Sequence, residues 1–148
     1  MNKKLLIFLM AVGMAVIFIT TGLQAGTEVA DTLKMETKEY SKHKKGIVEF
    51  SHKKHQVDYK IACGECHHDK DNKPLDLKTG DSVKRCVECH TKLKIDKNNK
   101  KDIMVLENAM HGNCRGCHKQ VNIKAGDPKG RKGPAPTSCS KCHPKKKK

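Results

Sequence analysis

The sequence is poor in the residues that usually build a protein core. It contains no tryptophan, two tyrosines and three phenylalanines among 148 residues, and aromatic residues make up only 3 %. After residue 25 the aromatic side chains are Tyr40, Phe50 and Tyr59. Charged residues make up 32 %, and the formal net charge is +15. A chain of this composition is typical of disorder, so a core built from its own apolar side chains is excluded.

Cysteine and histidine, by contrast, are abundant, with eight and nine copies. All eight cysteines fall in one motif, CxxCH, which occurs four times with its first cysteines 23, 28 and 25 residues apart. CxxCH is the attachment sequence of c-type haem: its thiols form thioethers with the porphyrin vinyl groups, and its histidine ligates the iron. We therefore predict four covalently bound haems c, which would supply the missing core. The motif residues are Cys63, Cys66 and His67; Cys86, Cys89 and His90; Cys114, Cys117 and His118; and Cys139, Cys142 and His143.

Two other uses of cysteine pairs compete with this interpretation. Zinc ribbons use two CxxC pairs for each metal ion, but a zinc site does not require a histidine directly after every second cysteine. Disulfides form in exported proteins, and they do not account for those histidines either. Covalent haem accounts for every residue of the motif.

Five histidines outside the motifs are candidates for the second axial position of each iron. Met35, Met104 and Met110 are alternative ligands, and a methionine would raise the reduction potential. His68 follows His67 directly and cannot reach the far face of the same porphyrin, so we expect it to ligate the iron of a neighbouring haem. The candidate histidines are His43, His52, His55, His68 and His111.

The N-terminus has the layout of a secretory signal peptide. Two lysines precede an apolar run over residues 5–19, and Ala25 offers a small residue at the cleavage position. We expect cleavage before Gly26 and export to the periplasm. An uncleaved membrane anchor is the alternative, because the apolar run is long for a signal peptide. A lipid anchor is not expected, since no cysteine precedes Cys63.

The motifs resemble those of the class III cytochromes c, the tetrahaem cytochromes c3 of sulfate- and metal-reducing bacteria. The shared features are the KKGIVEFSHKKH block, CxxCHH at the first motif, a lone histidine upstream of the third motif and the order of the four motifs. The resemblance implies a small multihaem cytochrome c fold that is mostly irregular, with a few short α-helices, a short two-stranded N-terminal β-sheet and a core of four covalent haems. The resemblance covers roughly residues 45–144. Together with the local sequence patterns, it divides the chain into a signal peptide (1–25), a flexible lead-in (26–45), a tetrahaem domain (46–144) and a lysine tail (145–148).

The same resemblance implies that two histidines ligate every iron. It matches Phe50 with a family phenylalanine that packs between haems. It gives His43 no counterpart, so we expect this residue to be solvated at the surface. Many members of the family widen the second and fourth motifs to CxxxxCH, whereas all four motifs are CxxCH here. The implied axial pairs are His67 with His52 for the first haem, His90 with His68 for the second, His118 with His55 for the third, and His143 with His111 for the fourth.

Local sequence patterns predict only short regular elements. Residues 47–50 are strand-like. The clearest helix is predicted over residues 102–110, with Asp102 as its cap and apolar residues at helical spacing. Asp81 is expected to cap a short helix that presents the second motif, and Ser138 is expected to start the last helical turn.

The function that we predict follows from the predicted axial ligands of the haem irons. If both axial positions of every iron are filled, no position is open for substrate, and bis-histidine ligation favours a low potential. We therefore expect an electron carrier and not an enzyme. The resemblance implies a periplasmic shuttle between hydrogenase or formate dehydrogenase and membrane-bound cytochrome complexes, in anaerobic respiration such as sulfate reduction. The alternative is a haem-based terminal reductase of metal ions or sulfur with one labile distal ligand, which the closeness of His111 to Cys114 favours.

The positive charge favours acidic redox partners, because a basic rim around an exposed haem edge attracts them over a long range. The resemblance implies docking of hydrogenases near the fourth haem, around Lys119 and Lys141. The alternative is that the lysines only keep a haem-rich protein soluble, which we expect of the tail. Nucleic acid is not an expected partner of an exported chain with so few aromatic residues. We expect a soluble monomer.

Overall fold

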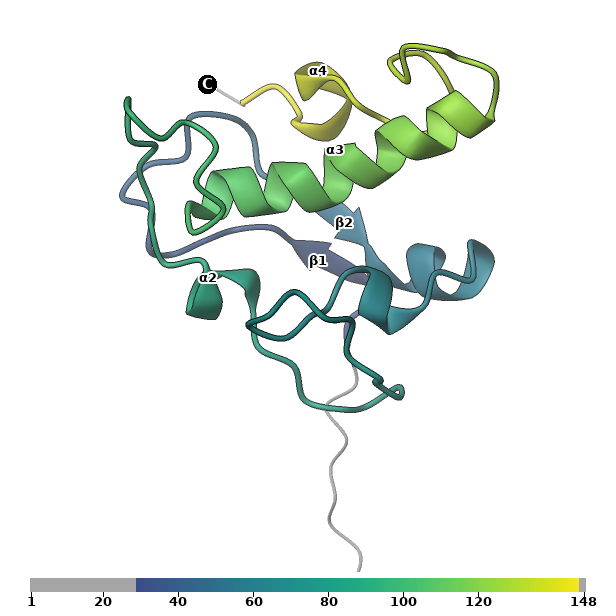
Figure 1. The fold of residues 1–148 in the computed structure, drawn as a ribbon, viewed down its shortest axis with the longest axis horizontal. Helices are drawn as coiled ribbons and strands as arrows, with labels where there is room; N and C mark the ends of the chain where they lie inside the picture. Colours follow the sequence, from purple (N-terminus) through teal and green to yellow (C-terminus); the bar gives the residue numbers. More distant parts are fainter. Residues whose placement is uncertain (1–28, 147–148) are drawn as a thin grey trace, which may run out of the picture.

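The structure is a computed structural model that describes residues 29–146, and the predicted signal peptide lies outside these residues. The regular elements are few and are joined by long irregular connections (Figure 1). The prediction of a mostly irregular fold with a few helices and a two-stranded N-terminal sheet is confirmed for the described residues. The elements are strands β1 (Thr32–Lys34) and β2 (Glu49–Ser51), the π-helical turn η1 (Lys54–Asp58), the 3₁₀ turn η2 (Cys63–Glu65), and helices α2 (Cys86–Cys89), α3 (Leu106–Lys124) and α4 (Cys139–Cys142).

The two strands form an antiparallel pair near the start of the described chain. Leu33 lies opposite Phe50, so these two apolar side chains share one face of the sheet. The strand predicted over residues 47–50 is shifted to Glu49–Ser51. Strand β1 lies within residues 26–45, which we predicted as a flexible lead-in; there, pairing with β2 orders the chain instead.

Helix α3 is the longest described element, and in the view of Figure 1 it lies between the sheet and α4. The helix predicted over residues 102–110 is present but wrong at both ends. Asp102 does not cap it, because the Asp102 carboxylate accepts hydrogen bonds from Lys92 Nζ and from the Met104 backbone amide instead. The helix begins only at Leu106. Neither α3 nor another helix among the described residues is long and apolar enough to cross a membrane.

The C-terminal half of α3 was not predicted. It runs on to Lys124 through Gly112 and Gly116, although a glycine inside a helix costs about 1 kcal/mol relative to alanine. The third CxxCH motif therefore lies inside a continuous helix. This places two different kinds of predicted haem residue, the motif and His111, on one rigid element.

The short helices carry the second and fourth motifs. Helix α4 follows Ser138, as predicted. Helix α2 follows Arg85 rather than Asp81. The Asp81 carboxylate instead accepts a hydrogen bond from the Lys78 backbone amide at 2.7 Å, which stabilises the turn before the helix.

Few side chains are buried in the described part of the chain. They are Val105, Leu106 and Ala109 at the start of α3, and Asn122 near its end. A domain of this size normally buries most of its apolar surface in a continuous core. The protein alone does not provide such a core here, which agrees with its composition.

The N-terminal and C-terminal parts of the described chain meet at Gly46. The Nδ1 atom of His143 donates to the Gly46 carbonyl at 2.8 Å. A Cβ atom at residue 46 would collide with the Pro144 carbonyl, so glycine is required for this close approach. This contact joins the segment before β2 to the fourth motif.

Candidate haem centres

Each CxxCH motif forms a helical turn. The first coincides with η2, the second with α2 and the fourth with α4, and the third lies within α3. In three motifs the backbone N–H of the histidine donates to the carbonyl of the first cysteine, at 2.9 Å for His67, 2.8 Å for His90 and 2.7 Å for His143. Residues three apart on such a turn are neighbours on one face. Both thiols of a motif can therefore reach one porphyrin.

The four motifs converge around Cys114 on α3. The pKa of its thiol is raised to about 11, first by burial and then by the neighbouring thiols of Cys66, Cys86 and Cys142. Asn113 donates to the Cys66 carbonyl at 3.2 Å, which ties α3 to the first motif. No two of the eight cysteines form a disulfide. Among residues 29–146, no three Cys, His, Asp or Glu side chains are grouped so as to hold a metal ion directly.

Three pairs of imidazole rings from distant parts of the chain lie close together, and they are pairs that the resemblance implies. An iron between two imidazoles holds each nitrogen at about 2 Å, which places the ring centres about 6 Å apart. The observed spacing therefore fits one iron between the rings of each pair, while ligation itself stays a prediction. The ring centres are 6.1 Å apart for His55 and His118, 5.8 Å for His68 and His90, and 6.2 Å for His111 and His143.

The fourth implied pair, His52 and His67, is also close in space. The pKa of His67 is lowered first by burial and then by the nearby imidazole of His52. The ring of Phe50 lies beside both residues of the N-terminal block, with its centre 6.1 Å from that of His52 and 4.7 Å from that of His55. Phe50 therefore contacts predicted distal ligands of two different haems.

Five predicted ligands share one hydrogen-bond pattern. In each, Nδ1 lies 2.7–2.9 Å from a backbone carbonyl oxygen. A carbonyl only accepts, so Nδ1 carries the proton and Nε2 keeps its lone pair for a metal. Such outer partners orient a ligating histidine and raise its basicity. The partners are Ser51 for His55, Asp69 for His68, Ile103 for His90, Pro136 for His118 and Gly46 for His143.

His111 and His43 do not share this hydrogen bond from Nδ1 to a carbonyl. The Nδ1 atom of His111 lies 3.9 Å from the Glu107 carboxylate one helical turn earlier, beyond hydrogen-bond distance. Burial lowers the pKa of His111, and Glu107 offsets part of this effect. His43 uses its other nitrogen, with Nε2 3.1 Å from the Thr37 carbonyl and its ring half-buried against Tyr40. The expectation that His43 is a solvated surface residue is therefore wrong.

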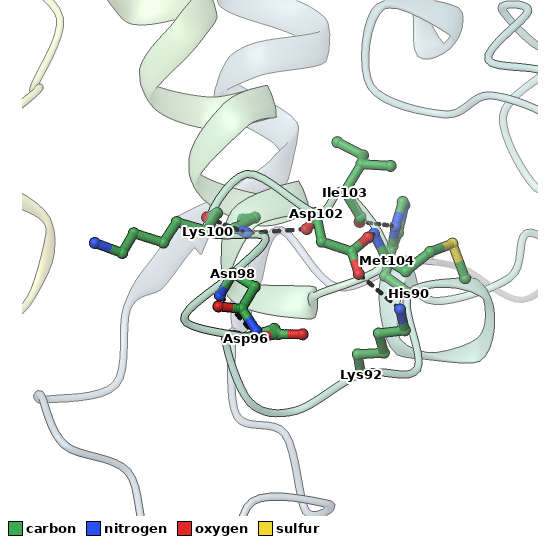
Figure 2. A network of polar contacts seen from close by, with 9 residues as sticks. His90, Lys92, Asp96, Asn98, Lys100, Asp102, Ile103 and Met104 are labelled. Atoms are coloured by element: carbon green, nitrogen blue, oxygen red, sulfur yellow. Dashed lines mark hydrogen bonds and ion pairs between the residues drawn. The ribbon is translucent and has the colours of Figure 1, made fainter.

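The carbonyl partners are functional groups that sequence analysis missed. Every residue has a backbone carbonyl, so no motif distinguishes Ile103 or Pro136 from its neighbours. Figure 2 shows the case of His90, which lies beside the turn that precedes α3. The partners become visible only when the folded backbone is known.

Comparison with known proteins identifies relatives of this chain. The model of the class III cytochrome c family matches residues 28–147. The chain is 34 % identical over 113 residues to the cytochrome c3 of Maridesulfovibrio salexigens, a match that covers 72 % of this chain and 87 % of that protein. It is 35 % identical over 85 residues to the nine-heme cytochrome c of Desulfovibrio desulfuricans, a match that covers 56 % of this chain and 20 % of that longer protein.

Proposed function

The chain belongs to the class III cytochrome c family and is a multihaem electron-transfer protein, and on this premise we propose that it is a periplasmic, low-potential electron carrier with four haems c. We infer that residues 1–25 direct its export. Electrons would pass through it from hydrogenase or formate dehydrogenase to membrane-bound redox complexes. Residues 46–144, together with β1, would form the tetrahaem domain.

The spacing of the imidazole pairs is the observation that carries this proposal. Three pairs have ring centres 5.8–6.2 Å apart, and five of the six imidazoles in these pairs donate Nδ1–H to a backbone carbonyl. A bound haem would supply a reversible one-electron step. The residues of this chain would attach it, fill both axial positions and thereby exclude substrate from the iron.

The charge of the chain supports an acidic partner. Its formal net charge is +15, and attraction between opposite charges raises the rate of encounter over long distances. The haem propionates would neutralise part of this charge and leave lysines in excess. The partner would therefore present a negatively charged surface near its own electron-transfer centre.

Reduction by hydrogenase at different salt concentrations tests this proposal. The oxidised holoprotein is mixed with a catalytic amount of periplasmic hydrogenase under hydrogen, and haem reduction is followed by absorbance. We expect complete reduction, with a rate that falls by on the order of tenfold or more between low and high ionic strength. A rate that does not depend on salt would contradict the electrostatic docking, and no reduction would contradict this choice of partner.

A terminal reductase is the second candidate, and the surroundings of His111 favour it. Like His52 and His67, this predicted axial ligand has no hydrogen bond from Nδ1 to a carbonyl of the described residues, and its Nδ1 lies 3.9 Å from the Glu107 carboxylate. Of these three, His111 alone lies three residues before the first cysteine of a motif. A loosely oriented ligand would dissociate more readily and open the iron. Reoxidation of the reduced protein by ferric citrate, with and without carbon monoxide, separates the two functions, because carbon monoxide slows only a reaction at an open iron.

A further inference from the structure

The turn between the second motif and α3 is held together by Asp102. Its side chain is only 13 % exposed, and both carboxylate oxygens are used: one accepts from Lys92 Nζ at 2.7 Å, and the other accepts from the Met104 backbone amide at 2.9 Å. The Asp102 carbonyl accepts from the side chain of Asn108 at 2.9 Å. Asp102 therefore joins three separate positions around the turn.

The residue that follows Asp102 presents its carbonyl to a predicted haem ligand. The Ile103 carbonyl accepts from Nδ1 of His90 at 2.8 Å. Backbone hydrogen bonds fix the chain on both sides of it, from Lys92 N–H to the Met104 carbonyl at 3.0 Å and from Leu106 N–H to the Lys92 carbonyl at 2.9 Å. Figure 2 shows the Asp102 carboxylate between Lys92 and Met104, with the Ile103 carbonyl beside His90.

Apolar packing contributes little at Ile103 and Met104, whereas Val105, the next residue, is buried. The side chain of Ile103 is 60 % exposed, and that of Met104 is 40 % exposed. The position of the Ile103 carbonyl therefore depends on polar contacts, which are those of the Asp102 carboxylate and the two backbone hydrogen bonds of Lys92. Lys92 is only two residues after His90, the donor, and Asp102 directly precedes Ile103, the acceptor. The Lys92–Asp102 ion pair therefore holds both partners of the hydrogen bond that orients the imidazole.

We propose that Asp102 is a positioning residue for the second haem: by holding Lys92 and the Met104 amide, it keeps the Ile103 carbonyl against Nδ1 of His90 and thereby sets the orientation and basicity of that ligand. The inference rests on the proposed function, in which His90 ligates the iron of the haem on the second motif. An imidazole that donates a strong hydrogen bond from Nδ1 is a more basic ligand and stabilises the oxidised iron. Loss of the Asp102 contacts therefore raises the potential of this haem relative to the other three.

The test compares Asp102→Ala and Asp102→Asn with the matched control Asp96→Asn. Asp96 lies in the same loop, where its carboxylate accepts from the Asn98 backbone amide at 2.8 Å. The two asparagine variants remove the same charge from the same region, but only the Asp102 variant removes the ion pair with Lys92. Lys92→Met breaks that link from the other side, at a side chain that is 59 % exposed, and it covers the case in which an Asp102 variant fails to fold.

The readout is the potential of each haem, from redox titrations followed by NMR of the holoprotein, together with the Nδ1–H resonance of His90. We expect a positive shift confined to the second haem and a displaced His90 resonance in Asp102→Ala and Lys92→Met, with a smaller shift in Asp102→Asn. Equal small shifts at all four haems in every variant, as in Asp96→Asn, would overturn the proposal. A wild-type protein with no haem on the second motif, or with His90 unligated, would instead overturn the proposed function, and haem counting on the same samples distinguishes the two failures.

Discussion

Hydrogen bonds to backbone carbonyls determine which ring nitrogen of a histidine carries the proton and which keeps its lone pair. Where Nδ1 donates to a fixed carbonyl, as in His118 with Pro136 at 2.7 Å, Nε2 is free and the ring cannot rotate without losing that bond. A net contribution of about 1 kcal/mol is usual for such a bond. In the folded holoprotein this is enough to keep one ring orientation dominant, with Nε2 directed to the predicted iron.

Replacement of one predicted distal ligand tests the assignment residue by residue. In His55→Met the potential of the third haem should rise by on the order of 100 mV, because a thioether favours reduced iron more than an imidazole does. Redox titration of the holoprotein measures this shift. The control is His43→Met, since His43 is not a predicted axial ligand and its Nε2 donates to the Thr37 carbonyl. Unchanged potentials in His55→Met, or an equal shift in the control, would show that the assignment is wrong.

Asn122 is a second residue with a large expected effect. Its buried carboxamide donates to the Ala135 carbonyl at 2.9 Å and accepts from the Ala135 amide at 2.9 Å. Alanine would leave these backbone groups unpaired, at about 1–3 kcal/mol each, so we expect Asn122→Ala to destabilise the holoprotein by about 2–4 kcal/mol in denaturant unfolding. The exposed Asn98→Ala should change stability by less than about 0.5 kcal/mol. Equal effects of the two substitutions would refute the role of Asn122.

The sequence identified the side chains of the site but not the backbone carbonyls that accept hydrogen bonds from them. The cysteines and histidines could be identified because the chemistry of haem attachment fixes their spacing, and the resemblance paired histidines that the structure places close together. Gly46 and Ile103 could not be found, because their contribution is a carbonyl whose position depends on the whole fold. His43 was misjudged because its partners, Thr37 and Tyr40, are defined by local folding rather than by a motif.

At the scale of elements, α3 organises the site. It carries His111 and the third motif, Asn113 ties it to the first motif, and Arg115 donates to the Thr137 carbonyl at 3.1 Å just before the fourth. Helical periodicity predicted only its N-terminal part. The continuation has two glycines and few apolar residues, so its helical state comes from tertiary contacts rather than from intrinsic propensity.

The loop after α3 gives a prediction about pH. The Asp127 carboxylate accepts hydrogen bonds of 2.5–3.1 Å from the backbone amides of Lys129, Arg131 and Lys132. These bonds, that from Lys132 foremost, hold the pKa of Asp127 below its usual value. A carboxylate with a lowered pKa stabilises the fold above the ordinary pKa of aspartate, about 4, and this contribution is lost as the pH falls through the lowered value.

Asp127→Asn should therefore be less stable than the wild type at pH 7, and the difference should disappear in strong acid. Thermal unfolding of the holoprotein between pH 2 and pH 7, roughly the range in which an aspartate titrates, measures this. Asp71→Asn is the control, because it removes only an exposed ion pair with Lys70 and should have a small effect throughout. A difference for Asp127→Asn that stays constant over this range would contradict the explanation.

At the scale of the whole molecule, the described protein chain lacks a continuous apolar core of its own. The buried side chains of the described chain are those of Val105, Leu106, Ala109 and Asn122. Each covalent haem would add a large apolar surface and two links that restrict the unfolded chain, as cross-links do. We therefore predict that a chain with all eight cysteines changed to alanine does not fold. Calorimetry checks this, and a cooperative unfolding transition in that variant would refute it.

That the chain is a multihaem protein could be predicted, because the composition and the four motifs are properties of the whole sequence and do not depend on its local folding. The motifs carried the resemblance to the family, and that resemblance implied the sheet and the few helices that the structure has. Local patterns did not predict that β1 is an ordered strand, because it is held by pairing with a strand that begins 15 residues later. Thr32 lies opposite Ser51 at one end of this pair, and Lys34 lies opposite Glu49 at the other. The close approach of Gly46 and Pro144 is likewise a long-range contact that local patterns do not reveal.

Four haems with both axial positions filled by histidine are the central claim, and one spectroscopic measurement tests it most directly. Haem is counted as the pyridine haemochrome, and the spectrum of the dithionite-reduced protein is recorded before and after carbon monoxide is added. We predict four haems per chain and no change on adding carbon monoxide. Fewer than four haems, or a shift in one haem's share of the spectrum, would contradict it, and a shift would indicate an open iron, first of all at His111.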